Sequence, residues 1–170
     1  MKADLQFEVA SELYRKITDG THDSPKQTEA GKHLITSKHI KGRSIDFDNA
    51  YLISEIDFKK INERSSVDQW DVIVSMIGEY CGFCYVERNK DIDYAVKNVG
   101  LYKAGTRLEA EWLYYYLTSP IGKQYLNSVK SGSSQPYLTL GGLRKLPILV
   151  PETRSVKKKV VKALLSHSLG

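Results

Sequence analysis

The pattern of apolar residues changes along this chain, and that change constrains the fold more than any other feature. Up to Lys103 the apolar residues come in short runs, and the β-branched run 72–74 predicts a buried strand closed by Gly78. From Glu109 they recur at helical spacing, and short apolar runs return near the end. Strands first, helices next and short strands again are typical of the α+β class rather than of alternating βαβ units.

The same patterns predict mixed or antiparallel strands packed with a few helices. Strands are expected at residues 34–40, 72–74, 81–87, 94–103, 137–140 and 146–150. Helices are expected in three places: one capped by Ser54 and Asp57 and ending near Ser65, one from Glu109 to Leu117, and one opened by Ser119 and Pro120 and ended by Gly132. Two segments are predicted to turn: residues 17–25, with their Asp-Gly and Asp-Ser-Pro signals, and residues 41–43.

The last segment, residues 152–170, stands apart from a main domain at residues 1–151. Its apolar residues form one helical stripe: Val156, Val160, Val161, Leu164 and Leu165. Lysines occupy the rest of the circumference, so an amphipathic helix is expected. Two copies of the chain would pair through this stripe across a two-fold axis, weakly because the stripe is short.

Length and composition bound the class of protein. A chain of 170 residues with 41% hydrophobic residues suits one domain with a proper core. No apolar run approaches the roughly 20 residues needed to cross a bilayer, so no membrane association is expected. The N-terminus mixes both charges and does not read as a signal peptide. With only two cysteines, these features predict a reducing cytoplasm.

Charge is distributed unevenly along the chain. Residues 1–120 hold 16 Lys/Arg against 19 Asp/Glu, a balance of −3, whereas residues 121–170 hold 9 against 1, a balance of +8. Such asymmetry indicates a side that faces a polyanion, with a merely solvated basic tail as the plainer interpretation.

No catalytic or metal-binding pattern stands out. Cys81 and Cys84 have C-x-x-C spacing, but a strand-like context predicts two core or half-buried thiols. The four histidines lack metal-ligand spacing, and the acids at 57 and at 91–93 are expected to be solvated charges rather than a nuclease centre. Residues 134–137 faintly echo an adenine methyltransferase motif, without a Gly-rich turn for a methyl donor. A non-enzymatic protein without cofactor or metal is therefore predicted.

Polar and basic loop residues are the candidates for contact with DNA, because cations bind phosphates and hydroxyl or amide groups reach base edges. Gln135 would either pair with an adenine edge or cap a turn, and His22 would either contact DNA or fix its own loop. The aromatic cluster 112–116 would stack bases or, more simply, pack against the sheet. The candidate DNA-binding residues are Thr21, His22, Lys26, Lys38, Lys41, Arg43, Lys130, Ser131, Ser133, Ser134, Gln135 and Tyr137.

Several ordered phrases resemble a target recognition domain of a type I restriction-modification specificity subunit. They are Ile17 to Pro25, Gly31 with 34–36, Gly42 with 45–46, Trp70 to Gly82, residues 115–119, the 131–135 loop and residues 143–151. The resemblance covers roughly Leu13 to Pro151, and its specificity lies in the order and spacing of the phrases.

The resemblance implies an α+β domain that reads one half of a split double-stranded DNA target. It also implies a cytoplasmic complex in which methyltransferase and restriction subunits use the methyl donor, ATP and magnesium. Full subunits of this family carry two such domains separated by long spacer helices, and residues 152–170 look like the start of one spacer. The chain would then be an isolated domain, a half-length subunit that dimerises, or a truncated product. A protein-docking module with a basic surface is the alternative from another class.

Overall fold

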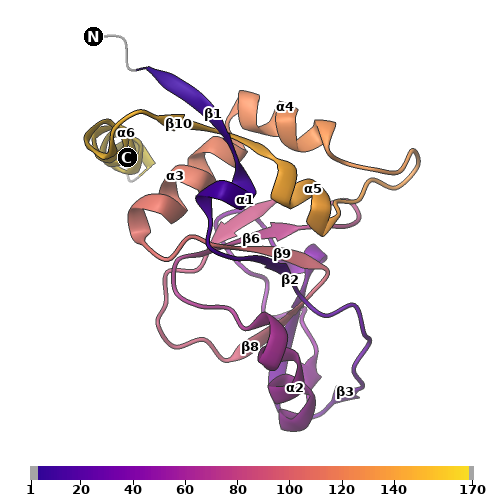
Figure 1. Ribbon diagram of the computed structural model, residues 1–170. Helices are drawn as coiled ribbons and strands as arrows, with labels where there is room; N and C mark the ends of the chain where they lie inside the picture. The colour runs from indigo at the N-terminus through magenta and orange to yellow at the C-terminus, as the bar shows by residue number, and fades with distance from the viewer. Residues whose placement is uncertain (1–3, 169–170) are drawn as a thin grey trace.

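The computed structural model describes residues 4–168, which form stacked layers of helices and sheets (Figure 1). The helices are α1 (Ala10–Leu13), α2 (Glu55–Ser65), α3 (Arg107–Thr118), α4 (Pro120–Ser128), α5 (Leu140–Lys145) and α6 (Arg154–Ser168), with a 3₁₀ turn, η1 (Ser37–His39). The strands are β1 (Leu5–Val9), β2 (Ile17–Asp19), β3 (Gln27–Thr28), β4 (Lys32–Thr36), β5 (Leu52–Ile53), β6 (Asp71–Ser75), β7 (Cys84–Val86), β8 (Tyr94–Lys97), β9 (Val99–Lys103) and β10 (Pro147–Pro151).

The strands make three sheets, and the predicted α+β class with mixed or antiparallel strands is confirmed. The central sheet has the order β2-β9-β6-β7 and is antiparallel throughout. A second sheet, β3-β5-β4-β8, contains one parallel pair, β4 with β8. The third sheet is the antiparallel pair β1-β10.

The central sheet is buried on both faces, which explains the continuous apolar run predicted as a strand. On β6, Val72 and Val74 pack against α3, α4 and α5, whereas Ile73 packs against the second sheet. The second sheet in turn buries Leu34 and Ala95 against α2. Figure 1 shows the resulting order of layers, with α3, α4 and α5 at the top, the two sheets below and α2 at the bottom.

The serines predicted to cap two helices do so in the structure. Ser54 accepts a hydrogen bond from the backbone N–H of Asp57, and α2 ends at Ser65 as expected. Ser119 accepts from the N–H of Gly122 at the start of α4, where Pro120 occupies the first turn. Helix α3 spans the predicted aromatic segment, and its cluster packs as expected: Trp112 donates to the carbonyl of Leu149.

One predicted strand is wrong, because residues 94–103 form two strands in different sheets. The chain leaves the second sheet after Lys97, turns at Asn98 with φ 55°, and enters the central sheet at Val99. Asparagine tolerates this left-handed conformation better than most residues, so the turn needs no glycine.

Other predictions need correction in their boundaries. The segment 17–25 is not all loop, since Ile17–Asp19 is a buried strand paired with β9. The strand expected at 34–40 ends at Thr36 and gives way to η1. Residues 137–140 make only isolated bridges before α5, a helix that the sequence patterns did not indicate. The N-terminal β1 and α1 were also missed, and α4 ends at Ser128, before Gly132.

The C-terminal amphipathic helix is present as α6, but its apolar stripe is divided between two surroundings. Val161 is buried, and α6 packs against α3, where Lys157 donates to Glu109. Val160 and Leu164 remain 38% exposed on the outer side. Within residues 4–168, no helix is long and apolar enough to cross a membrane.

The two cysteines are buried and unpaired with one another, as the sequence predicted. Burial raises the pKa of the Cys84 thiol to about 12 and also raises that of Cys81. A thiol held protonated in this way is a poor nucleophile, so the C-x-x-C spacing here is structural.

Candidate nucleic-acid interface

Most of the predicted contact residues lie at one end of the two main sheets. Strand β6 runs toward this end and stops at Ser75, while the antiparallel β9 starts there at Val99. Strand β2 ends there at Asp19, and the parallel strands β4 and β8 end there at Thr36 and Lys97. The loops that follow these strands are therefore gathered by strand register, and we call this end of the molecule the strand-end face.

The loop after β2, residues 20–26, is fixed by a buried carboxylate. Asp19 accepts hydrogen bonds from Arg64 Nη2 at 2.6 Å and from His22 Nε2 at 2.7 Å, and its own side chain is only 7% exposed. The other ring nitrogen of His22 lies 3.1 Å from Asn98 Oδ1. His22 therefore holds its own loop, as one of its two predicted roles required, and its 58% exposed side chain still reaches the surface.

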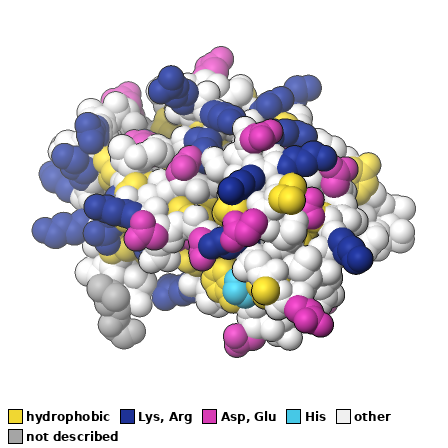
Figure 2. All heavy atoms as spheres, turned by 90° about the horizontal axis from the view of Figure 1, so that it is seen from below, with side chains coloured by type: hydrophobic (Ala, Val, Ile, Leu, Met, Phe, Trp, Pro, Cys, Tyr) yellow, Lys and Arg dark blue, Asp and Glu magenta, His cyan; other side chains and the backbone are white. Residues whose placement is uncertain are grey.

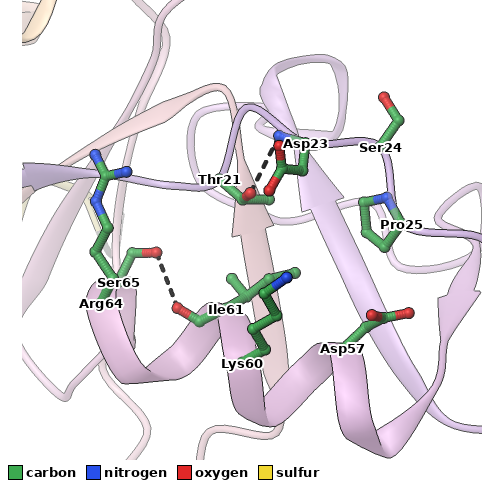
Figure 3. Close-up of a pocket in the computed structure, with 9 residues that line it drawn as sticks. All are labelled: Thr21, Asp23, Ser24, Pro25, Asp57, Lys60, Ile61, Arg64 and Ser65. Atoms are coloured by element: carbon green, nitrogen blue, oxygen red, sulfur yellow. Dashed lines mark hydrogen bonds between the residues drawn. The ribbon is translucent and has the colours of Figure 1, made fainter.

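A cleft of about 400 Å³ separates this loop from α2. In Figure 3 the loop that carries Thr21, Ser24 and Pro25 lies above α2, which carries Lys60 and Arg64, and the Ser24 hydroxyl points away from the helix. Asp23 and Asp57 also line the cleft, so its charges are mixed rather than uniformly basic. Thr21 and Asp23 are tied to one another through the Thr21 hydroxyl, which accepts from the Asp23 N–H.

A second hollow, the strand-end groove, opens between η1 and the loop that joins β6 to β7. It has a volume of about 340 Å³, and its lining includes Lys38, Lys97 and Asn98. Lys41 lies beside it, with its ammonium 3.7 Å from the centre of the Tyr80 ring. The groove thus presents cations, an amide and an aromatic face together, with one carboxylate, Glu79, in its lining.

The 3₁₀ turn η1 anchors this groove to the core. The Ser37 hydroxyl donates to the carbonyl of Asn98 and accepts from the N–H groups of Met76 and Ile77. His39 Nδ1 accepts from the Thr36 N–H, and its Nε2 faces the Asn49 carbonyl at 3.2 Å. Burial lowers the pKa of His39, so a neutral ring that accepts at one nitrogen and donates at the other fits both partners.

The loop between α4 and α5, residues 129–139, closes the face on its other side. Ser131 and Tyr137 exchange backbone hydrogen bonds of 2.8 and 3.0 Å, which makes residues 131–137 a tight excursion turned by Gly132 at φ 86°. Lys130 donates to the carbonyl of Cys81 at 3.0 Å and ties the loop to the β6–β7 connection. Gln135 is exposed and makes no side-chain hydrogen bond to another residue within 4–168, so the turn-capping role predicted as one alternative is not observed.

These parts join into one surface. Lys97 of the groove donates to Ser24 of the β2–β3 loop at 2.6 Å, and Ile77 of the groove pairs with Tyr137 of the α4–α5 loop. In Figure 1 the β2–β3 and α4–α5 connections both lie on the right, away from α6. Ile77 and Tyr137 are each 43% exposed, so an apolar pair sits beside the polar loop.

Two of the predicted contact residues lie away from the hollows of the strand-end face. Lys26 is exposed at the end of the β2–β3 loop, beyond the residues that line the cleft. Arg43 lies in a different pocket, with Arg88 and Arg107. The remaining ten predicted contact residues lie in the three loops or at η1: Thr21, His22, Lys38, Lys41, Lys130, Ser131, Ser133, Ser134, Gln135 and Tyr137.

Sequence reasoning missed several residues of the face, among them Lys60, Arg64, Lys97 and Asn98. Lys60 and Arg64 belong to helix α2 rather than to a loop, and they reach the cleft only because α2 packs under the second sheet. Lys97 and Asn98 were placed inside one strand, and Asn98, a residue type that favours turns, is the signal that would have indicated a turn there.

No group of three or more His, Cys, Asp or Glu side chains within residues 4–168 is arranged to hold a metal ion. The strand-end face offers ammonium, guanidinium, hydroxyl and amide donors around shallow hollows. Donor groups of these kinds can bind phosphates and base edges, so the strand-end face is suited to binding a polar, anionic ligand.

The fold defines the class of protein that this chain is similar to, namely the S subunits of type I restriction-modification systems. No protein-family model matches the chain, and no curated protein matches it in sequence. The structural likeness at low identity nevertheless confirms the fold expected from the sequence resemblance.

Two solved structures illustrate the likeness. One is the S subunit of a type I restriction-modification system from M. genitalium, with a TM-score of 0.63 and 12% identity over 96% of this chain. The other comes from a study of complex assembly and conformational transition of a type I system, with a TM-score of 0.66 and 13% identity over 99% of this chain. This chain spans about 39% of the length of each.

Proposed function

We propose that this chain reads double-stranded DNA as the specificity component of a type I restriction-modification complex. The observation that carries the proposal is the strand-end face, where loops from three parts of the sequence are joined by direct hydrogen bonds. Lysines of that face would hold phosphates, and the 131–137 loop would enter a groove of the duplex and contact base edges. The share of neighbour length that the chain spans fits one recognition domain, which would read one half of a split target.

The proposed role is non-catalytic and uses no cofactor of its own. Methylation and cleavage would belong to methyltransferase and restriction subunits, in the cytoplasm. Residues 1–151 would form the recognition domain, and α6 would begin a spacer helix in the segment 152–170. The exposed Val160 and Leu164 on the outer side of α6 are the residues through which two copies would pair.

Gln135 is the residue whose replacement tests base reading most directly. Its exposed amide can donate and accept at once, as a bidentate pair with an adenine edge requires, and such a pair discriminates by about 1–3 kcal/mol. The experiment is selection from a random double-stranded DNA library by the purified chain, followed by sequencing of the bound pool. We expect one short motif to be enriched, and Gln135→Ala to lose preference at one position of that motif.

Gln124→Ala is the matched control, since Gln124 is exposed on α4 and outside the loops of the strand-end face. It should leave the enriched motif unchanged. If neither the wild-type chain nor the control enriches any motif while both bind acidic polymers alike, the reading role is rejected and protein docking becomes the better account. If Gln135→Ala weakens all sequences equally, Gln135 contacts the backbone rather than a base.

A further inference from the structure

A pocket on the side of α3 and α6 gathers three arginines. Its volume is about 300 Å³, and the side chains of Arg43, Arg88 and Arg107 line it together with Tyr114 and Tyr115. None of the residues that line it is acidic. Three guanidinium groups repel one another when they share a small space, so their convergence indicates a place for an anion.

Arg88 is held in position from below by a buried carboxylate. Its Nε and Nη2 donate to the two oxygens of Glu111 at 2.9 Å each, and its Nη1 donates to the carbonyl of Val86. Glu111 is fully buried, so the fork is oriented by the core. A guanidinium has five N–H groups, and these contacts use three of them. The other two remain available to a ligand, since the Arg88 side chain is 44% exposed.

Arg43 and Arg107 supply the charge that is not already balanced. Both are exposed, and neither forms an ion pair with another residue of the described range 4–168. Arg43 comes from the turn after η1 and Arg107 from the first turn of α3, so segments far apart in the sequence build the pocket. In Figure 2 Lys and Arg side chains are numerous on the left, which is the side of α6 in Figure 1, and others lie along the top and centre of the view.

We infer that this pocket binds a phosphate group. Guanidinium forks match the planar pairs of oxygens of phosphate, and the space suits a compact anion better than a length of polypeptide. Tyr115 adds a hydroxyl, which lies 3.4 Å from the Ser168 hydroxyl. The phosphate would come either from a DNA backbone that extends past the strand-end face or from a free phosphate or mononucleotide. The inference does not depend on sequence reading by Gln135.

The test compares the wild-type chain with the double variant Arg43→Gln/Arg107→Gln. Arg88 is left in place because its removal would strand the buried Glu111. The control is Lys158→Gln/Lys159→Gln, which removes the same charge from exposed positions of α6. Inorganic phosphate is titrated while the arginine Nε–H resonances are followed by NMR. We expect saturable shifts in the wild type and control, and affinity at least about tenfold weaker in the double variant.

Two further arms identify the source of the phosphate. If the double variant also weakens binding to a long random-sequence duplex and lowers its salt slope by about one unit per lost contact, the DNA backbone is the source. If only phosphate and mononucleotide binding falls, a free ligand is the source. The proposal is overturned if the double variant and the lysine control respond alike, or if glutamate shifts the same resonances as strongly as phosphate, which would indicate an acidic protein segment instead.

Discussion

The buried carboxylate of Asp19 should make an exposed arginine unusually important for stability. Arg64 is 64% exposed, and an ordinary surface ion pair contributes only about 0–1 kcal/mol. Asp19 is 7% exposed, however, and water reaches it poorly. Arg64→Ala would leave that carboxylate with His22 as its remaining side-chain partner, at a cost of about 1–3 kcal/mol. For a chain of this size, a loss of about 2 kcal/mol lowers the melting temperature by about 4–8 °C.

The assay is thermal unfolding of Arg64→Ala, of Asp19→Asn and of the double variant. Lys60→Ala is the control, since Lys60 is exposed one turn earlier on α2 and lines the same cleft. It should change the free energy of unfolding by about 0.5 kcal/mol or less. The double variant should lose less free energy of unfolding than the sum of the two single-variant losses, because the two residues share one interaction. Equal melting temperatures for Arg64→Ala and Lys60→Ala would refute the argument that burial of Asp19 sets the cost.

Two further predictions concern pH and association. Burial lowers the folded-state pKa of His39, so the unfolded chain takes up a proton first as pH falls below about 6.5. The contribution of His39 to stability should therefore be complete above that pH and decline toward about pH 5. Melting temperatures measured across pH should show a smaller decline for His39→Gln. Val160 and Leu164 predict a weak dimer through α6, visible by sedimentation at high concentration and lost in Val160→Glu/Leu164→Glu; a monomer at every concentration would contradict it.

Local signals in the sequence located most helices because a helix start depends on residues close to one another. Ser54 and Ser119 cap α2 and α4 through their own neighbours three residues on, and no distant contact is needed. The buried strand at β6 was equally visible, since its three central residues are all apolar, as expected of a strand covered on both faces.

The elements that were missed depend on contacts between distant segments. Helix α5 contains Gly141 and Gly142, which disfavour a helix, yet Leu143 is buried where α5 approaches Gly100 of β9 so closely that an added Cβ would lie 2.2 Å from Leu143 Cδ1. Strand β1 forms only because β10, more than a hundred residues later, pairs with it. Gly100, a glycine inside strand β9, was the one local sign that another segment, here α5, approaches closely.

The spatial grouping of the candidate contact residues could not be predicted from the sequence, because it too depends on contacts between distant segments. Polar loop residues could be recognised singly, whereas their grouping follows from the register of β2, β4, β6, β8 and β9 at one end of the sheets. Arg43 shows the limit, since only Gly42 separates it from Lys41 and yet the two side chains lie at different hollows.

The division between core and loops also accounts for a shared fold at 12–13% identity. Consecutive apolar residues such as Val72, Ile73 and Val74 pack alternately on the two faces of the central sheet. Other apolar side chains of similar volume can fill the same layers, so the core tolerates wide divergence. The 131–137 loop is closed by backbone bonds between Ser131 and Tyr137, which do not depend on the side chains between them. Residues such as Gln135 can therefore change without loss of the frame, which is the freedom that the proposed reading of DNA would need if the target is to change on one scaffold.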